Sequence, residues 1–245
     1  MHSLILSAGM GGLAGLVNGL TAVGYGSVLL PVLLALGLPA GGAVAAILVS
    51  VAVTSLLGGL LHWRSIRLKR EVLLPLIAGG VLGAKIGAGL SASIDEQRLR
   101  SFVLLAALAL IALHFLGGRL WRGARPHHLS LAVFLAAAAG GLSTGALGIG
   151  WGYITIPALV ALGVNIHETL GASLLSRGLM SLSGALGHVH DLNGEILGLA
   201  MLLSITAAAG TMLGVSLSRR ISSEHLGGVV HGWLALLAGR MLMGG

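Results

Sequence analysis

The chain has 245 residues, of which 56% are hydrophobic and only 9% are charged, and its mean hydropathy is +1.01. A soluble domain carries about 25% charged residues, so this composition cannot cover a water-facing surface and excludes a soluble protein. Cysteine is absent, which excludes disulfides, thiolate metal sites and catalytic thiols. We therefore predict an all-α, polytopic protein of the lipid bilayer.

Each half of the chain contains five apolar stretches. In chain order they are 4–21, 27–38, 41–63, 72–90 and 99–116, then 129–147, 153–164, 167–188, 196–217 and 226–242. Most approach the ~20 residues that a helix needs to span a bilayer, but the second stretch of each half is too short to span alone. We predict that each short stretch is one arm of a broken or re-entrant helix, within roughly 8 membrane segments overall.

The two halves share one residue pattern at a constant separation of 126 positions. The recurring residues include glycines, a proline and a histidine of each half: Gly15, Gly19, Gly24, Gly26, Pro31, Gly37, Gly58 and His62 return as Gly141, Gly145, Gly150, Gly152, Pro157, Gly163, Gly184 and His188. A duplicated apolar chain with Gly-broken segments is typical of secondary transporters. We divide it into a first repeat (1–117), a cytoplasmic linker (118–128) and a second repeat (129–245).

Loop charges predict how the repeats cross the membrane. The net charge of +7 comes from short basic loops, which is the positive-inside pattern rather than a nucleic-acid site. The loop at 64–70 is basic, whereas its counterpart at 191–195 has no Lys or Arg. We therefore predict inverted repeats in a bacterial inner membrane, with both termini outside the cytoplasm. The first segment has no basic region before it and is expected to stay uncleaved.

The Gly-rich breaks are the predicted working parts. Glycines at 24–26 and 150–152 precede short apolar runs that contain Pro31 and Pro157. A helix that starts after such a break leaves its first N–H groups free, and these groups bind anions. Inverted repeats would point two such helix ends at the middle of the membrane. The alternative is that the glycines only allow close helix packing.

The paired glycine turns, each followed by an apolar run and a proline, resemble the sulfite exporter TauE/SafE family of membrane transporters. The resemblance covers essentially the whole chain and includes the pattern that ends at Gly58 and Gly184. It implies a carrier of sulfur-containing anions such as sulfite or organosulfonates. The chain departs from the fuller poly-glycine form of the motif, because Tyr25, Ser27, Trp151 and Tyr153 stand among the glycines, so the substrate could differ in size from that of relatives.

Ionisable residues inside the apolar stretches add candidates. Arg177 lies mid-stretch, where a charge costs roughly 2.5–3.5 kcal/mol, so it is predicted to contact substrate or act in gating. It could instead be a structural arginine that binds loose carbonyls at a helix break, or one that reaches an interface. His62 and His188 could carry a coupling proton, or they could be ordinary interface histidines.

The sequence therefore predicts a secondary transporter of a small anion, of the sulfur oxyanion or organosulfonate class, that works by alternating access. The predicted substrate-binding residues come from both breaks: Asn18, Gly24, Gly26, Ser27, Thr144, Gly150, Gly152, Tyr153 and Arg177. No enzymatic activity, cofactor or metal is expected. Alternatives are a divalent metal-cation permease, suggested by ten His and seven Met, and a non-transporting assembly subunit. Glycine-rich surfaces could also support a homodimer.

Overall fold

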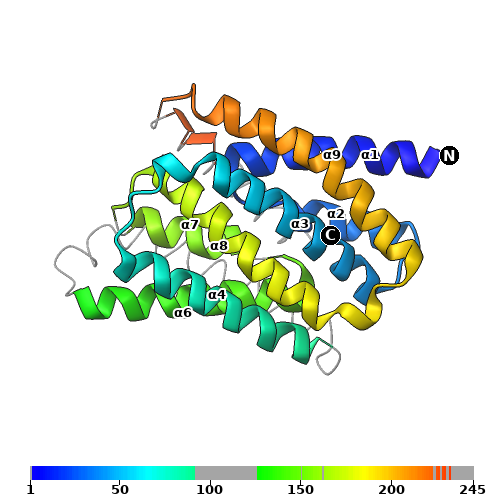
Figure 1. Cartoon of the computed structure of the whole chain (residues 1–245), viewed down its shortest axis with the longest axis horizontal. Coiled ribbons are helices and arrows are strands. Elements are labelled where there is room, and N and C mark those ends of the chain that lie inside the picture. Colours follow the sequence, from blue (N-terminus) through cyan, green and yellow to red (C-terminus); the bar gives the residue numbers. More distant parts are fainter. Residues whose placement is uncertain are drawn as a thin grey trace.

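The computed structural model describes residues 2–91, 126–149, 151–161 and 163–222, together with 225, 226, 228, 229 and 232. All regular structure in this part of the chain is helical, as expected (Figure 1). The predicted stretch 99–116 and most of 226–242 lie outside the described residues, as do Gly150 and the linker up to residue 125.

The helices repeat in the same order in the two halves. The first half contains α1 (His2–Thr21), α2 (Gly26–Ala35), α3 (Ala40–Leu61), the short 3-10 helix η1 (Trp63–Ser65) and α4 (Arg70–Leu90). The second contains α6 (Pro126–Leu147), α7 (Trp151–Ala161), α8 (Ile166–Gly187), η2 (Val189–Asp191) and α9 (Gly194–Ser218). The bounds of α3 and η1 return 126 residues later as those of α8 and η2, so the duplicated sequence forms duplicated structure.

Four described helical segments are long and apolar enough to cross a membrane: 40–61, 70–90, 130–147 and 194–218. α2 and α7 are short and apolar, as the sequence predicts, and each contains its proline. α8 is as long as α3 but less apolar, because it carries Arg177 and several serines. The chain is thus a polytopic helical membrane protein.

The helices pack into two bundles that do not coincide with the two halves. α1 of the first half lies along α9 of the second, and α4 lies along α6. One bundle is therefore α1, α2, α3 and α9, and the other is α4, α6, α7 and α8. The pair α3 and α8 joins the bundles at the centre of the molecule (Figure 1).

Glycines bring the exchanged helices together. A Cβ atom on any of them would collide with a backbone carbonyl of the facing helix: Gly15, Gly19, Gly210 and Gly214 between α1 and α9, and Gly83, Gly87, Gly141 and Gly145 between α4 and α6. Small residues allow such backbone contact in membranes, where packing rather than burial from water drives helix association. For these glycines, the alternative stated from the sequence, that they allow close helix packing, is therefore correct.

α3 and α8 run in opposite directions. Gly171, near the start of α8, lies against His62 at the end of α3, and Gly41 at the start of α3 lies against Asp191 just beyond α8. Figure 1 shows the same opposition: α3 runs from right to left and α8 from left to right. The equivalent central helices of the two halves are antiparallel.

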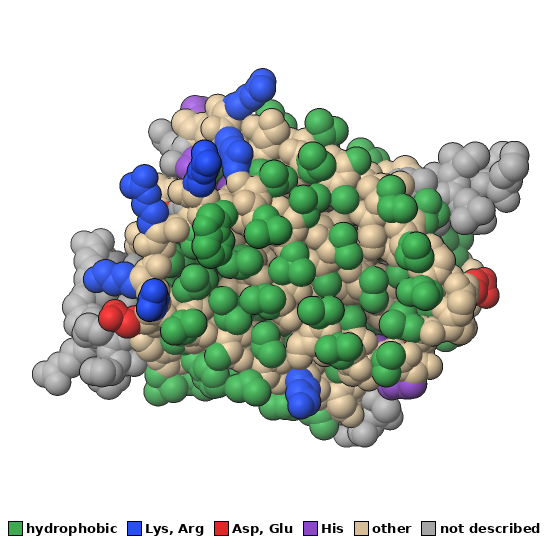
Figure 2. Space-filling model, in the orientation of Figure 1, with side chains coloured by type: hydrophobic (Ala, Val, Ile, Leu, Met, Phe, Trp, Pro, Cys, Tyr) green, Lys and Arg blue, Asp and Glu red, His purple; other side chains and the backbone are tan. Residues whose placement is uncertain are grey.

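Charged side chains occupy the ends of the molecule. Hydrophobic side chains cover the middle of the face in Figure 2, and Lys and Arg gather at its left edge. The connection from α3 to α4, with Arg64, Arg67, Lys69 and Arg70, and the end of α9, with Arg219 and Arg220, lie on this side in Figure 1, and we call it the basic end. The opposite, acidic end contains Asp191 and Glu195. A lipid-facing belt between two polar ends is the surface expected of a membrane protein.

Candidate functional site

The two breaks meet at the centre of the molecule. The first break (residues 22–25) connects α1 to α2, and the second (residues 148–150) connects α6 to α7. Gly26 lies against the carbonyl of Gly148, and Gly152 lies against the carbonyl of Val23, so closely that neither position has room for a Cβ. Gly26 and Gly152 therefore serve packing of one break on the other, which the sequence offered as the alternative.

Left-handed backbone conformations produce both breaks. Gly24 has φ +93° and Gly148 has φ +69°, whereas Ala22, which matches Gly148 in the repeat, has φ +52°. Glycine adopts positive φ without steric cost. Gly24 needs glycine for a second reason: a Cβ there would lie 2.8 Å from a terminal nitrogen of Arg177.

Arg177 links α8 to the first break. It is 2% exposed and sits midway along α8. Its Nη1 donates to Asn18 Oδ1 at 2.8 Å, and its Nη2 donates to the carbonyl oxygen of Val23 at 2.6 Å. The side chain is thus bound to a loose carbonyl of a helix break and does not reach an interface. It also lines the central cavity, so a structural role and a ligand role coincide in one guanidinium.

The central cavity lies between the breaks. Its lining includes residues of both halves: Val23, Gly24, Tyr25, Gly26, Ser27, Val51, Thr144, Gly148, Ile149, Trp151, Tyr153 and Arg177. Its volume is about 20 Å³, which is room for one water molecule. An anion with three or four oxygens requires the breaks to move apart.

Two hydroxyl groups in this lining are buried without a partner. Ser27 Oγ and Tyr153 Oη lie near each other but form no hydrogen bond of ordinary distance and angle with any described residue, and neither does Asn18 Nδ2 beside Arg177. Ser27 and Tyr153 occupy equivalent positions of the two repeats. Buried polar groups are normally paired, so unpaired hydroxyls beside a cavity point to a ligand or water.

Two further aromatic residues, Tyr25 and Trp151, bind the breaks to neighbouring helices. Tyr25 Oη lies 2.7 Å from Ser50 Oγ and 3.1 Å from Thr54 Oγ1 on α3. Trp151, its counterpart in the repeat, donates from Nε1 to the Ser173 hydroxyl on α8 at 3.0 Å. Each break is therefore tied to the central helix of its own half.

Thr144 holds the second break from within. Its hydroxyl lies 2.8 Å from the carbonyl oxygen of Gly140 and accepts the Trp151 N–H at 3.0 Å, which satisfies the first amide of α7. In the described conformation this helix end is capped by protein. The first break has no matching threonine, because the equivalent residue is Asn18, which binds Arg177 instead.

The two repeat-related histidines lie at opposite ends of the molecule. His62 is fully buried at the basic end, where Ser218 Oγ lies 3.4 Å from its Nε2 and its Nδ1 has no partner in the described residues. Burial, with a smaller contribution from Arg219, lowers the pKa of His62 to about 4. Burial thus favours the neutral imidazole, and a coupling role for His62 stays a prediction.

His188 is buried at the acidic end, outside the central cavity. Its Nδ1 lies 3.1 Å from Asp191 Oδ2, and its Nε2 lies 2.8 Å from the carbonyl oxygen of Gly145. The sequence marked His188 but gave no sign of this partner on α6, because Gly145 and His188 are far apart in the chain. Neither histidine contacts Arg177 directly.

A helical membrane protein with a partly polar cavity between two broken helices has the architecture of a membrane transporter. The chain belongs to the sulfite exporter TauE/SafE family, whose sequence profile matches residues 7–241. The family resemblance stated from the glycine turns is thereby confirmed.

Two relatives agree with this assignment. Both are named probable membrane transporter proteins, from Xylella fastidiosa strains Temecula1 and 9a5c. The first is 31% identical over 255 residues and the second 32% over 256 residues, each covering 96% of this chain and 93% of the relative. No solved structure matches the chain. The family is one of transporters, so the function of the chain is membrane transport.

Proposed function

We propose that the protein is a secondary transporter of a small anion, of the sulfur oxyanion or organosulfonate class, that works by alternating access. One observation carries the proposal: the cavity between the two breaks is lined by Arg177 and by the buried hydroxyls of Ser27 and Tyr153. A guanidinium and hydroxyl donors are the groups that bind oxyanions. The family name supports the sulfur-containing class.

The cavity also supports a mechanism in which the bundles move. Its volume of about 20 Å³ does not admit an oxyanion, so substrate entry requires separation of the two breaks. Each break belongs to a different bundle, and only the α3–α8 pair joins the bundles extensively. The proposed moving units are therefore the bundles with their exchanged helices, α9 in one and α4 in the other, rather than the sequence halves.

The antiparallel packing of α3 and α8 supports inverted repeats, and the charged ends give the orientation. The basic end faces the cytoplasm by the positive-inside rule, and the acidic end faces the opposite side of a bacterial inner membrane. α1 begins at the acidic end in Figure 1, which is consistent with an external N-terminus. Reporters placed at Arg67 and Asn193 should be found on opposite sides of the membrane. Finding both on one side would overturn this topology.

The transport experiment uses purified protein in liposomes with labelled sulfite and a labelled organosulfonate. Ser27→Ala and Tyr153→Phe each remove one hydroxyl that has no protein partner, so the fold should persist. Each hydrogen bond to substrate is worth about 0.5–1.5 kcal/mol, so KM should rise roughly two- to tenfold. Ser55→Ala is the matched control, because Ser55 Oγ is also buried and unpaired but does not line the cavity.

The proposal is wrong if neither anion moves, or if divalent cations move in their place. It is also wrong if Ser55→Ala raises KM as much as the two cavity variants do. A rise limited to Ser27→Ala and Tyr153→Phe would assign the cavity to the transported anion.

A further inference from the structure

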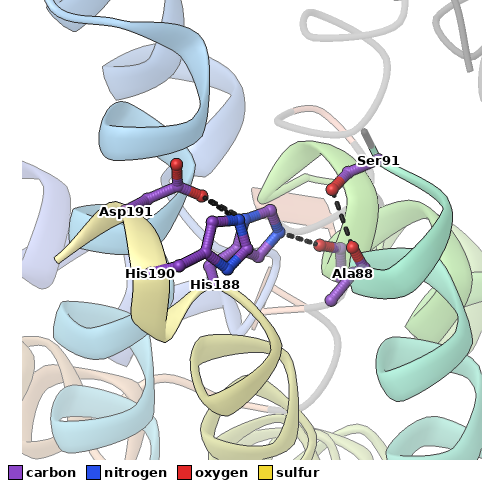
Figure 3. A network of polar contacts seen from close by, with 6 residues as sticks. Ala88, Ser91, His188, His190 and Asp191 are labelled. Atoms are coloured by element: carbon purple, nitrogen blue, oxygen red, sulfur yellow. Dashed lines mark hydrogen bonds and ion pairs between the residues drawn. The ribbon is translucent and has the colours of Figure 1, made fainter. Parts of the chain in front are cut away.

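The end of α6, immediately before the second break, is held by a residue from outside both breaks. The Gly145 carbonyl belongs to the last turn of α6, where carbonyl oxygens lack partners within the helix. His188 Nε2 supplies that partner at 2.8 Å (Figure 3). Thr144, the residue before Gly145, lines the cavity and caps the first amide of α7. One hydrogen bond thus connects His188 to the wall of the anion site.

Both ring nitrogens of His188 face acceptors. Nε2 faces the Gly145 carbonyl, and Nδ1 faces Asp191 Oδ2 at 3.1 Å. A neutral imidazole carries one N–H and one acceptor nitrogen, whereas the imidazolium carries two donors. Only protonated His188 satisfies both contacts while Asp191 is a carboxylate. A cation at the C-terminal end of α6 also interacts favourably with the helix dipole.

The other groups around His188 leave Asp191 as its counter-ion. Asp191 also lies 3.4 Å from His190 Nε2, and its carboxylate packs on Gly41 at the start of α3. Beside His188, α4 presents Ala88 against Gly187, and α6 presents Gly145. Lys85 on α4 and Glu195 on α9 are exposed, and no ion pair of the described residues joins either one to His188.

We propose that His188 is a proton-binding site that controls the second break, so that proton binding at the acidic end is coupled to the shape of the anion cavity. With the proton bound, His188 holds the end of α6 in place and the cavity closed. Without it, neutral His188 can donate to only one of the two acceptors, so a lone pair faces either the Gly145 carbonyl or the Asp191 carboxylate and the hold on the second break weakens. As a mechanism of coupling, this inference rests on the proposed function.

The first test needs no substrate. Trp151 lies at the second break and donates its backbone N–H to Thr144, so its fluorescence reports the shape of that break. The chain has four tryptophans, and replacing Trp63, Trp121 and Trp233 with Phe leaves Trp151 alone. We expect its emission to change with pH, because His188 holds the end of α6 differently with and without its second proton. His188→Gln keeps an N–H donor for Gly145 but cannot titrate, so the transition should disappear.

Two further variants keep the test decisive. His190→Gln is the matched control, because His190 contacts the same carboxylate but is exposed, and it should leave the transition unchanged. Asp191→Asn removes the counter-ion without altering His188, and should weaken or abolish the transition. If His188→Gln does not fold, Asp191→Asn still tests whether the transition depends on His188 and its counter-ion.

Transport gives the second readout. Labelled sulfite flux should change at least threefold with the pH at the acidic end, and His188→Gln should remain active without that dependence. A Trp151 transition that survives in His188→Gln, or that ignores Asp191→Asn, would overturn the inference. If the transition depends on His188 but sulfite does not move, the proposed substrate class is wrong and the proton site stands.

Discussion

The first and second breaks are related by the repeat but are held in different ways. The Val23 carbonyl of the first break is bound by Arg177, a charged group from the opposite bundle. The second break is fixed by Thr144 within its own bundle and by His188 beside it. Val51 and Arg177 occupy equivalent positions and both line the cavity, yet only one of them can bind an anion. Duplication thus supplies a symmetric framework, and its second copy supplies the ionisable groups that hold both breaks.

The largest effect is expected from Arg177. Arg177→Gln removes the charge and leaves Asn18 Oδ1 and the Val23 carbonyl without a charged donor. Hydrogen bonds to charged groups contribute about 1.5–3 kcal/mol each, so thermal unfolding should show a loss of about 3 kcal/mol or more, and transport should fall below detection. Arg64→Gln at the exposed basic end is the control and should change neither. Normal transport in Arg177→Gln would remove this residue from the site.

Gly24→Ala tests the contact between the first break and Arg177. The variant combines strain at φ +93° with a Cβ 2.8 Å from Arg177 Nη1, and should cost about 2–3 kcal/mol. Gly37→Ala is a matched control, since Gly37 has φ +86° but nothing within 4 Å of the added Cβ. Its cost should be about 1–2 kcal/mol from strain alone. If chemical denaturation gives the same loss of unfolding free energy for both variants, the close approach of residue 24 to Arg177 has no energetic consequence.

His62 should make the protein sensitive to acid. Its pKa is about 4 in the folded protein, below the ordinary 6.5, so the unfolded chain binds the proton more strongly between these values. The contribution of His62 to stability is complete above pH 6.5 and is lost as pH falls through 4. His62→Gln should therefore weaken the acid dependence of unfolding by about 2 kcal/mol. An unchanged pH profile would mean that His62 is charged or solvated in the fold.

Gly148→Ala should have the smallest effect. The first break already places Ala22 at the equivalent left-handed position, and a Cβ at Gly148 makes only ordinary contacts, at 3.4 Å from Ile47 Cγ2 and 3.8 Å from Val44 Cγ1. We expect a loss of about 1 kcal/mol in thermal unfolding and retained sulfite transport. Loss of transport at unchanged stability would show that the second break needs a glycine for its movement at a position where the first break does not.

Much of the framework follows from the sequence because membrane helices leave strong local signals. The predicted starts and ends of α3, α4, α8 and α9 lie within a few residues of those observed, and the short helices begin at the predicted glycine turns. The cavity also contains several of the residues chosen from the sequence: Gly24, Gly26, Ser27, Thr144, Tyr153 and Arg177. Repetition at fixed spacing marked them, since the same irregular backbone had to be encoded twice.

Contacts between residues far apart in the sequence could not be predicted in this way. The exchange of α4 and α9 between bundles depends on which glycine faces meet, and several helices carry such faces. The bond from Arg177 to Asn18 spans 159 residues, and that from His188 to Gly145 joins a side chain to a carbonyl that any residue would offer. Nor did the sequence indicate that Gly26 and Gly152 let the two breaks touch, and their role in anion binding stays a prediction.

The sequence alone therefore determined the membrane class, the duplication, the position of each break and the candidates for the site, because hydropathy and glycine spacing are local properties of a chain in lipid. Only the tertiary structure decided which carbonyls Arg177 and His188 hold, and that equivalent histidines are buried in unlike surroundings. Those choices depend on the distances and solvation created when two bundles close on each other, and no single stretch of sequence contains them.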